Sequence, residues 1–462
     1  VMLRVRPFHH LAIAVVAAAF VLPAAADARP HLDAALEAVR EGDLDAALEA
    51  AARVPEGDPW YTDAAFCIAW VHAERGEAER SADAYRRVVT LRPDDARAWN
   101  NLGSALDDAG RLEEALAAYD RSIALDDRFA PAHNNRGVTL DKLGEGARAA
   151  QAFEAASARD AQYAAPHNNL GLWYYEIGDR RAAAQSWARA AAIDPAYVSP
   201  LVNSAVLEFE GDREGVAERR LQELVESGRA TADVWFNLGV FAHRRGAWQR
   251  SVECMEEADT LRPRHAQTLN NLGVLYLRLG TDRRAERALR ACVEVSPDMA
   301  KAWDNLGLVL YRGGRYAEAR EAFETEVGIE PESAAAHYNL GCALAAEGRV
   351  DDAARSFERA TELAPTHVDA LHNLAVLMAE RDDRDAGREL ALYQRILKVD
   401  PDHAQAHLSL GRFYQSEPKH RDLRKAHEHY KRYVDLDRSG SPTRDQVLDT
   451  MAAIRAHLDR RR

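Results

Sequence analysis

Apolar residues recur at helical spacing along most of the chain. In residues 96–129, Trp99, Leu102 and Leu106 share one stripe of a first helix, and Ala115 and Tyr119 share the facing stripe of a second. Runs of β-branched residues are few. The pattern predicts pairs of helices, each with an apolar face that only a neighbouring pair can cover.

The polar positions repeat with a period of 34 residues. We call the most regular set the asparagine ladder: Asn101, Asn135, Asn169, Asn203, Asn237, Asn271, Asn305, Asn339 and Asn373. A glycine column keeps the same period with one gap, at Asp212: Gly42, Gly76, Gly110, Gly144, Gly178, Gly246, Gly280, Gly314 and Gly348. The glycine column predicts the turn that ends each first helix, because glycine adopts the left-handed conformation at little cost.

The period divides residues 28–437 into twelve repeats, and within each repeat we number the places from the first residue. The repeats start at residues 28, 62, 96, 130, 164, 198, 232, 266, 300, 334, 368 and 404. Residues 441–462 predict a capping helix with an apolar stripe at Val447, Met451, Ile454 and Leu458. The chain is therefore expected to be a linear array.

The repeat resembles the tetratricopeptide repeat (TPR) family. Residues 96–129 carry Trp, Leu, Gly, Ala and Tyr at the fourth, seventh, eighth, twentieth and twenty-fourth places. The resemblance implies an all-α, right-handed superhelical solenoid of about twelve helix-turn-helix repeats, closed by the C-terminal capping helix.

The asparagine ladder occupies the sixth place, off the apolar packing stripe. Asparagine inside a helix costs up to about 0.7 kcal/mol relative to alanine, so nine of them need a reason. A primary amide can both donate to and accept from an extended peptide backbone. With first helices about 9 to 10 Å apart, the ladder would span roughly 80 Å of groove, enough for about two dozen extended residues.

The ladder is similar to that in the TPR superhelix of O-linked N-acetylglucosamine transferases, where it holds polypeptide. The catalytic region of those enzymes has no counterpart in this sequence. The resemblance implies that the nine ladder asparagines form a peptide-binding groove. An alternative is that each amide only bridges neighbouring helices.

Composition narrows the choice of partner. The 462 residues are 47% hydrophobic and 29% charged, with a formal net charge of −14. This acidic balance argues against a nucleic-acid partner and against peripheral binding to anionic lipid. We expect a protein or peptide partner and no membrane insertion after signal cleavage.

Residues 1–26 have the pattern of a secretory signal peptide. Arg4 and Arg6 precede an apolar run from Leu11 to Leu22, and small residues follow Pro23. The run is short for a membrane span of about 20 residues. We expect cleavage after Ala26 or after Ala28, and an exported protein that is periplasmic or secreted.

Candidate chemistry is sparse. Four cysteines at different phases do not form a disulfide framework, and we expect each to be a small buried side chain. Cys67 falls in the asparagine column, so an alternative for it is a thiol exposed in the groove. His403 and His407 are four apart on a helix but lack a third metal ligand. His133, His167, His337 and His407 hold the fourth place, where other repeats have Trp, so we expect them to pack. We expect no catalytic residues, cofactor or metal.

The sequence therefore predicts an exported, non-catalytic adaptor that binds extended polypeptide in a concave, asparagine-lined groove. Two alternatives stay open. The protein could be a structural scaffold that assembles an envelope or secretion complex through its outer surfaces, or the protein-binding subunit of a transferase encoded separately.

Overall fold

The computed structural model describes residues 28–379, 385–438 and 441–460, which form 25 helices and no strand. The expected signal segment, residues 1–26, lies outside the described residues. None of the described helices is both long enough and apolar enough to span a bilayer. The chain divides into two compact units, unit 1 (Val1–Ala247) and unit 2 (Trp248–Arg462). The predicted all-α array of helical pairs is confirmed.

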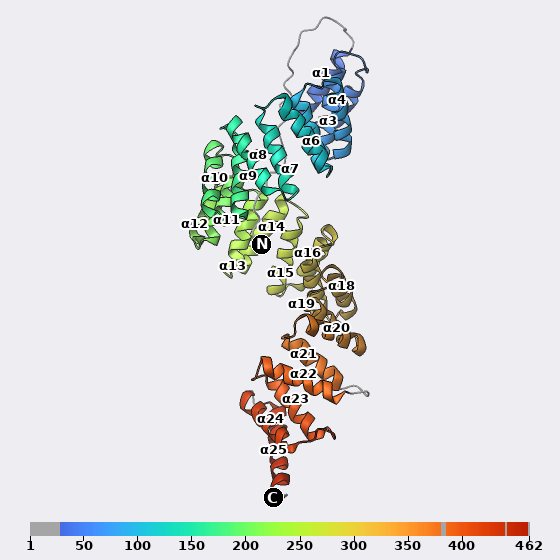
Figure 1. The fold of residues 1–462 in the computed structure, drawn as a ribbon, viewed down its shortest axis with the longest axis vertical. Coiled ribbons are helices and arrows are strands. Elements are labelled where there is room, and N and C mark those ends of the chain that lie inside the picture. Colours follow the sequence, from blue (N-terminus) through green and yellow to red (C-terminus); the bar gives the residue numbers. More distant parts are fainter. Residues whose placement is uncertain (1–27, 380–384, 439–440, 461–462) are drawn as a thin grey trace. The chain divides into compact units, whose positions relative to one another are not determined.

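Unit 1 is a series of helix-turn-helix pairs in which each helix packs against the next in sequence (Figure 1). First and second helices alternate from the N-terminal end. Its helices are α1 (Arg29–Glu41), α2 (Leu44–Ala52), α3 (Tyr61–Glu74), α4 (Ala78–Leu91), α5 (Ala96–Asp108), α6 (Leu112–Leu125), α7 (Ala130–Lys142), α8 (Gly146–Arg159), α9 (Ala164–Glu176), α10 (Arg180–Ile193), α11 (Val198–Glu210), α12 (Glu214–Glu226) and α13 (Ala232–Arg244).

Unit 2 continues the same alternation and ends in a single helix that packs on α24. This last helix forms the predicted cap: Val447 and Ile454 are buried, whereas Met451 and Leu458 are half-buried. The helices of unit 2 are α14 (Trp248–Leu261), α15 (Ala266–Arg278), α16 (Asp282–Val295), α17 (Ala300–Arg312), α18 (Tyr316–Ile329), α19 (Ala334–Ala346), α20 (Val350–Leu363), α21 (Val368–Ala379), α22 (Ala386–Val399), α23 (Ala404–Ser416), α24 (Leu423–Leu436) and α25 (Pro442–Asp459).

The turn inside each pair depends on one left-handed residue. Gly110 has φ 76°, and the next amide, of Arg111, donates to the carbonyl of Leu106 at 2.8 Å. In the repeat that lacks this glycine, Asp212 adopts φ 58° and the following Arg213 amide donates to Glu208 O. Aspartate is among the few residues that tolerate this conformation, so the turn survives the gap in the glycine column.

A second glycine, at the eighth place, sets how closely the two helices of a pair approach. A Cβ atom added to Gly307 would lie 2.4 Å from Cε1 of Phe323, and one added to Gly171 would lie 2.3 Å from Nε1 of Trp187. The ring at the twenty-fourth place therefore occupies the space of the missing side chain.

The fourth-place rings have a role beyond packing. Trp99 Nε1 donates to the Pro93 carbonyl at 3.0 Å, six residues earlier, in the loop that precedes the helix. Trp303 makes the same bond at 2.9 Å, and the Nε2 atoms of His133, His337 and His407 make it at 3.0 Å. Indole and imidazole both place an N–H at this point, which explains why Trp and His interchange there.

The glycine contact can be tested within one repeat. We expect Gly307→Ala to lower stability by about 2 kcal/mol, because the added methyl group overlaps the Phe323 ring. Gly328→Ala is the matched control, since nothing lies within 4 Å of its added Cβ, and it should raise stability by up to about 1 kcal/mol through helix propensity. Urea unfolding followed by circular dichroism measures both, and equal effects would contradict the close-approach argument.

Candidate functional site

The asparagine ladder lies on the first helices of successive pairs and is largely shielded from solvent. In unit 1, Asn135, Asn169, Asn203 and Asn237 are buried. The remaining members, Asn101, Asn271, Asn305, Asn339 and Asn373, are half-buried. No ladder residue is fully exposed, so the amides are positioned by their surroundings before any ligand arrives.

In unit 1 the ladder amides connect successive first helices through the fifth place of the preceding repeat. Asn135 Nδ2 donates to Asn100 Oδ1 at 3.1 Å, and Asn169 Nδ2 donates to Asn134 Oδ1 at the same distance. Asn203 repeats the bond to Asn168, also at 3.1 Å. Asn237 differs because its Nδ2 donates to the Asp233 carbonyl of its own helix.

Unit 2 keeps the pattern with varied acceptors. Asn305 Nδ2 donates to Asn270 Oδ1 at 3.0 Å, and Asn339 Nδ2 donates to Asp304 Oδ1 at 2.8 Å. The last ladder member, Asn373, is 3.9 Å from Cys342 Sγ, which is a weak acceptor.

The bridging hydrogen bonds use the Nδ2 donor of the amide, and they do not use its carbonyl oxygen, Oδ1. Among the described residues, nothing donates to Oδ1 of Asn169, Asn305 or Asn339. Each of these oxygens is held at a fixed orientation by the bond that its own Nδ2 makes. The site therefore presents oriented hydrogen-bond acceptors.

The sequence did not reveal that the fifth-place residues accept hydrogen bonds from the ladder amides of the following repeat. The available signal is the adjacent Asn-Asn pairs, for example Asn100-Asn101, Asn134-Asn135 and Asn270-Asn271. Such a pair supplies one amide to each of two neighbouring helices, so a periodic doublet is the pattern to look for.

Cys67 is not a groove thiol. Its side chain is only 5% exposed, and burial raises the pKa of the thiol to about 11. It packs with Ala64 and Val71 in the apolar core of the first repeats. The alternative of a groove-exposed thiol is therefore wrong, and the expectation of a small buried side chain is confirmed for Cys67.

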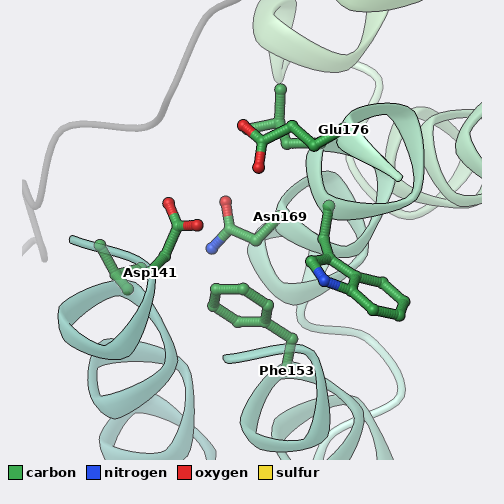
Figure 2. Close-up of a pocket in the computed structure, with 7 residues that line it drawn as sticks. Asp141, Phe153, Asn169 and Glu176 are labelled. Atoms are coloured by element: carbon green, nitrogen blue, oxygen red, sulfur yellow. The ribbon is translucent and has the colours of Figure 1, made fainter. Parts of the chain in front are cut away.

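A pocket opens beside Asn169 in unit 1, and we call it the Asn169 pocket. Its volume is about 360 Å³, including the part open to solvent. Figure 2 shows the Asn169 amide above the Phe153 ring, with the carboxyl groups of Asp141 and Glu176 on two sides. The residues that line it are Val138, Asp141, Phe153, Asn169, Leu172, Trp173 and Glu176.

Two carboxyl groups of the α17–α18 pair in unit 2, Asp304 and Glu326, influence each other electrostatically. Burial raises the pKa of Asp304, although the hydrogen bond from Asn339 opposes the shift. Burial also raises the pKa of Glu326, with further contributions from the charges of Asp304 and Glu330, to about 8. Glu326 is 6% exposed and its Oε2 has no hydrogen-bond partner among the described residues.

The C-terminal histidines form a pair without a third metal ligand. His407 Nε2 donates to the Pro401 carbonyl, which leaves its Nδ1 to accept from His429 Nδ1 at 3.0 Å. Burial, then the neighbouring His407 and Lys425 charges, lower the pKa of His429 to about 4. Within the described part of the chain, no group of three or more His, Cys, Asp or Glu side chains could hold a metal ion.

Comparison with known families identifies the family to which these repeats belong. The tetratricopeptide repeat models match residues 32–95, 66–128 and 334–367. The model of the middle TPR-like domain of cilia and flagella-associated protein 70 matches residues 207–328. The chain belongs to the tetratricopeptide repeat family, whose repeats serve as protein-interaction modules in adaptors and scaffolds. No curated protein matches the sequence.

Solved structures with a similar fold are distant in sequence. A tetratricopeptide repeat protein from Parabacteroides merdae ATCC 43184 is 14% identical, over 54% of this chain and 98% of that one, with a TM-score of 0.47. An IFIT1 monomeric mutant solved with Gppp-AAAA is 16% identical over 81% and 90%, with a TM-score of 0.47. MamA from Desulfovibrio magneticus RS-1 is 20% identical over 37% and 96%, with a TM-score of 0.35.

The buried Glu326 carboxyl predicts a pH-dependent stability. Below pH 4.5, its ordinary pKa, the carboxyl is protonated in the folded and unfolded states and costs nothing. Above that pH the unfolded state ionises first, so folding loses stability until pH reaches about 8. We expect Glu326→Gln to stabilise the protein at pH 8 by about 2 kcal/mol, allowing for solvent screening, and to change little at pH 4.5.

Thermal unfolding at the two pH values measures this effect. Glu332→Gln, at an exposed loop position, is the control and should not change the midpoint at either pH. If Glu326→Gln shifted the unfolding midpoint equally at both pH values, the effect would not come from ionisation of a buried carboxyl group.

Proposed function

We propose that this protein is an exported, non-catalytic adaptor that binds extended polypeptide along the face of its first helices. The observation that supports this most directly is the free carbonyl oxygen of Asn169, Asn305 and Asn339. An extended chain carries backbone N–H groups at regular intervals, and a row of oriented acceptors matches them. Such contacts do not depend on the side chains of the bound polypeptide.

The hydrogen bonds between neighbouring helices support binding in a second way. An amide that is already fixed loses little rotamer freedom when a ligand arrives, so more of its interaction energy contributes to affinity. In unit 1 the Asn169 side chain is 5% exposed and held by Asn134. Asn169, Asn305 and Asn339 would each then offer one acceptor at low entropic cost.

The scaffold alternative has an observation of its own. The same Nδ2 bonds join successive first helices, for example Asn339 to Asp304. If bracing were their entire purpose, binding would use the outer surfaces and the free oxygens would be incidental. A transferase subunit would bind polypeptide in the same way, and a stable complex with the enzyme would reveal it.

Matched pairs of variants separate bracing from binding. Asn169→Ala with Asn305→Ala removes two free oxygens and two bracing bonds. Asn134→Ala with Asn270→Ala removes the same two bracing bonds but keeps both oxygens. We expect the first double variant to weaken binding about thirty-fold, at about 1 kcal/mol for each of two hydrogen bonds, and the second to stay within about two-fold.

The ligand for this test is a fluorescent pool of unstructured peptides about 25 residues long, selected on the wild-type protein, and the measurement is fluorescence anisotropy. Circular dichroism confirms that both double variants keep their helicity. Equal weakening in the two variants would support the scaffold alternative, because only the bracing bonds are common to both.

We also propose that the chain is exported and processed. Mass spectrometry of the protein recovered from the periplasm or the medium should find a mature N-terminus at Asp27 or Arg29, since small residues precede both bonds. Recovery of the intact protein from the cytoplasmic fraction alone would contradict export.

A further inference from the structure

The first helices α15 and α17 of unit 2 carry three cationic residues and one acidic residue. Arg278 ends α15, whereas Lys301 and Arg312 lie near opposite ends of α17, and we call these three residues the basic face. All three are exposed. The single carboxyl side chain on these helices, Asp304, already accepts a hydrogen bond from Asn339 at 2.8 Å. A concentration of positive charge in a chain with a formal net charge of −14 needs a local explanation.

The basic face follows the same stripe as the asparagine ladder. On α17, Lys301 is four residues before Asn305, and Arg312 is seven residues after it. On α15, Arg278 is seven residues after Asn271. Residues at these spacings lie on one side of a helix, so the cations stand one or two turns from a ladder amide. A polypeptide held by the ladder would therefore pass beside them.

Two of these cations have no acidic partner. The Arg278 guanidinium lies over the Trp248 ring, 4.1 Å from its centroid, and it forms no ion pair with any described residue. The Lys301 ammonium likewise has no ion pair or hydrogen bond within the described part of the chain. An aromatic face stabilises a cation but does not neutralise it. Arg278 and Lys301 therefore keep a charge that an anionic ligand can use.

Arg312 is held beside α15 and is only partly neutralised. Its Nη1 donates to the Leu277 carbonyl at 3.4 Å, and its Nη2 is 3.6 Å from Asp282 Oδ1. A ladder bond joins the same two first helices further along their length. The two helices thus lie side by side, and Arg278 and Arg312 stand at corresponding ends of them.

From this arrangement we infer that the basic face binds carboxylate side chains, Asp or Glu, of a polypeptide held along the ladder of unit 2. The inference deepens the proposed function and rests on it for the path of the bound chain. Guanidinium and ammonium groups donate charge-assisted hydrogen bonds to carboxylates. The free oxygen of Asn305, between Lys301 and Arg312 on α17, accepts from the backbone of the same polypeptide. Backbone and side chains are then bound by different groups of one helix.

The basic face is confined to α15 and α17 among the described first helices at the C-terminal end of unit 2. In α19, α21 and α23, the described residues at the second and thirteenth places are uncharged or acidic: Ala335, Ala346, Asp369, Gln405 and Ser416. A carboxylate of the bound chain therefore finds cations at one part of the ladder and not at the next. This difference selects which segment of an acidic polypeptide lies there.

A nucleic-acid strand fits the basic face less well than a peptide does. Its phosphates would pair with the cations, but a phosphodiester backbone has no N–H group to donate to the Asn305 oxygen. The net charge of the protein also opposes the approach of a uniformly charged polyanion. An acidic peptide supplies both the backbone donors and the carboxylates.

The test compares two unstructured peptides about 25 residues long, one built of Glu-Ser dipeptides and the other of Gln-Ser dipeptides. Alternation places every Glu on the same side of an extended chain. We expect the wild-type protein to bind the Glu peptide about ten-fold more tightly in fluorescence anisotropy, as the combined effect of three exposed ion pairs. Equal affinity for the two peptides would overturn the inference and leave backbone capture intact.

A matched pair of variants locates the effect. Arg278→Gln with Lys301→Gln removes the two cations without acidic partners and should lower the preference to about two-fold, with no change in affinity for the Gln peptide. The control, Arg287→Gln with Lys398→Gln, removes one exposed arginine and one exposed lysine from the second helices α16 and α22 and should keep the preference. An equal loss in the control would overturn the inference, because the preference would then follow overall charge. Circular dichroism confirms that both variants keep their helicity.

A probe without backbone N–H groups separates this inference from the proposed function. A peptoid carries its side chains on the backbone nitrogen atoms, so it can present carboxyethyl or carbamoylethyl groups but cannot donate to the ladder. We expect the carboxylate peptoid to bind more tightly than the amide peptoid, and each to bind more weakly than the corresponding peptide. A carboxylate peptoid that binds as tightly as the Glu peptide would support the basic face and contradict backbone capture. Displacement of the Glu peptide by an equimolar oligothymidylate would overturn the assignment to carboxylates in favour of a nucleic-acid strand.

Discussion

The structure depends on the close approach of the two helices in each pair. Because Gly171 has no side chain, the Trp187 ring lies against its backbone, and the two helices of the pair can pack closely before they stack on the next pair. Repetition of that contact places the same positions of successive first helices beside one another. A hydrogen bond between residues 35 positions apart, such as Asn169 to Asn134, can then recur along the stack.

The two ends of the ladder amide have separate tasks. The NH₂ group joins neighbouring repeats, and it does so where polar side chains are nearly removed from water. A hydrogen bond in that setting also determines side-chain orientation, because the alternative is a buried amide without a partner. The carbonyl oxygen then points in a defined direction. Bracing and peptide binding are therefore compatible roles for one residue, although the sequence alone presents them as alternatives.

How far the sequence predicts this structure depends on the range of each interaction. Helical pairs and their turns follow from local spacing, and even Asp212 keeps its turn because aspartate tolerates a positive φ. The partner of an amide is different, since it depends on how far one first helix is rotated against the next. The same limit applies to Cys67, which shares the asparagine phase but lies in the core, and to the Asn169 pocket, whose walls come from three helices.

A row of identical acceptors has one physical weakness as a binding site. Backbone contacts that repeat along the peptide are equally good after a shift of the register, so they give affinity without fixing position. One site that differs from its equivalents removes that degeneracy. The ladder supplies such differences, because Asn237 donates within its own helix and Asn373 lies beside Cys342 Sγ. A polypeptide bound along the ladder would gain most of its free energy from the repeated amides and its register from the positions where the ladder departs from its pattern.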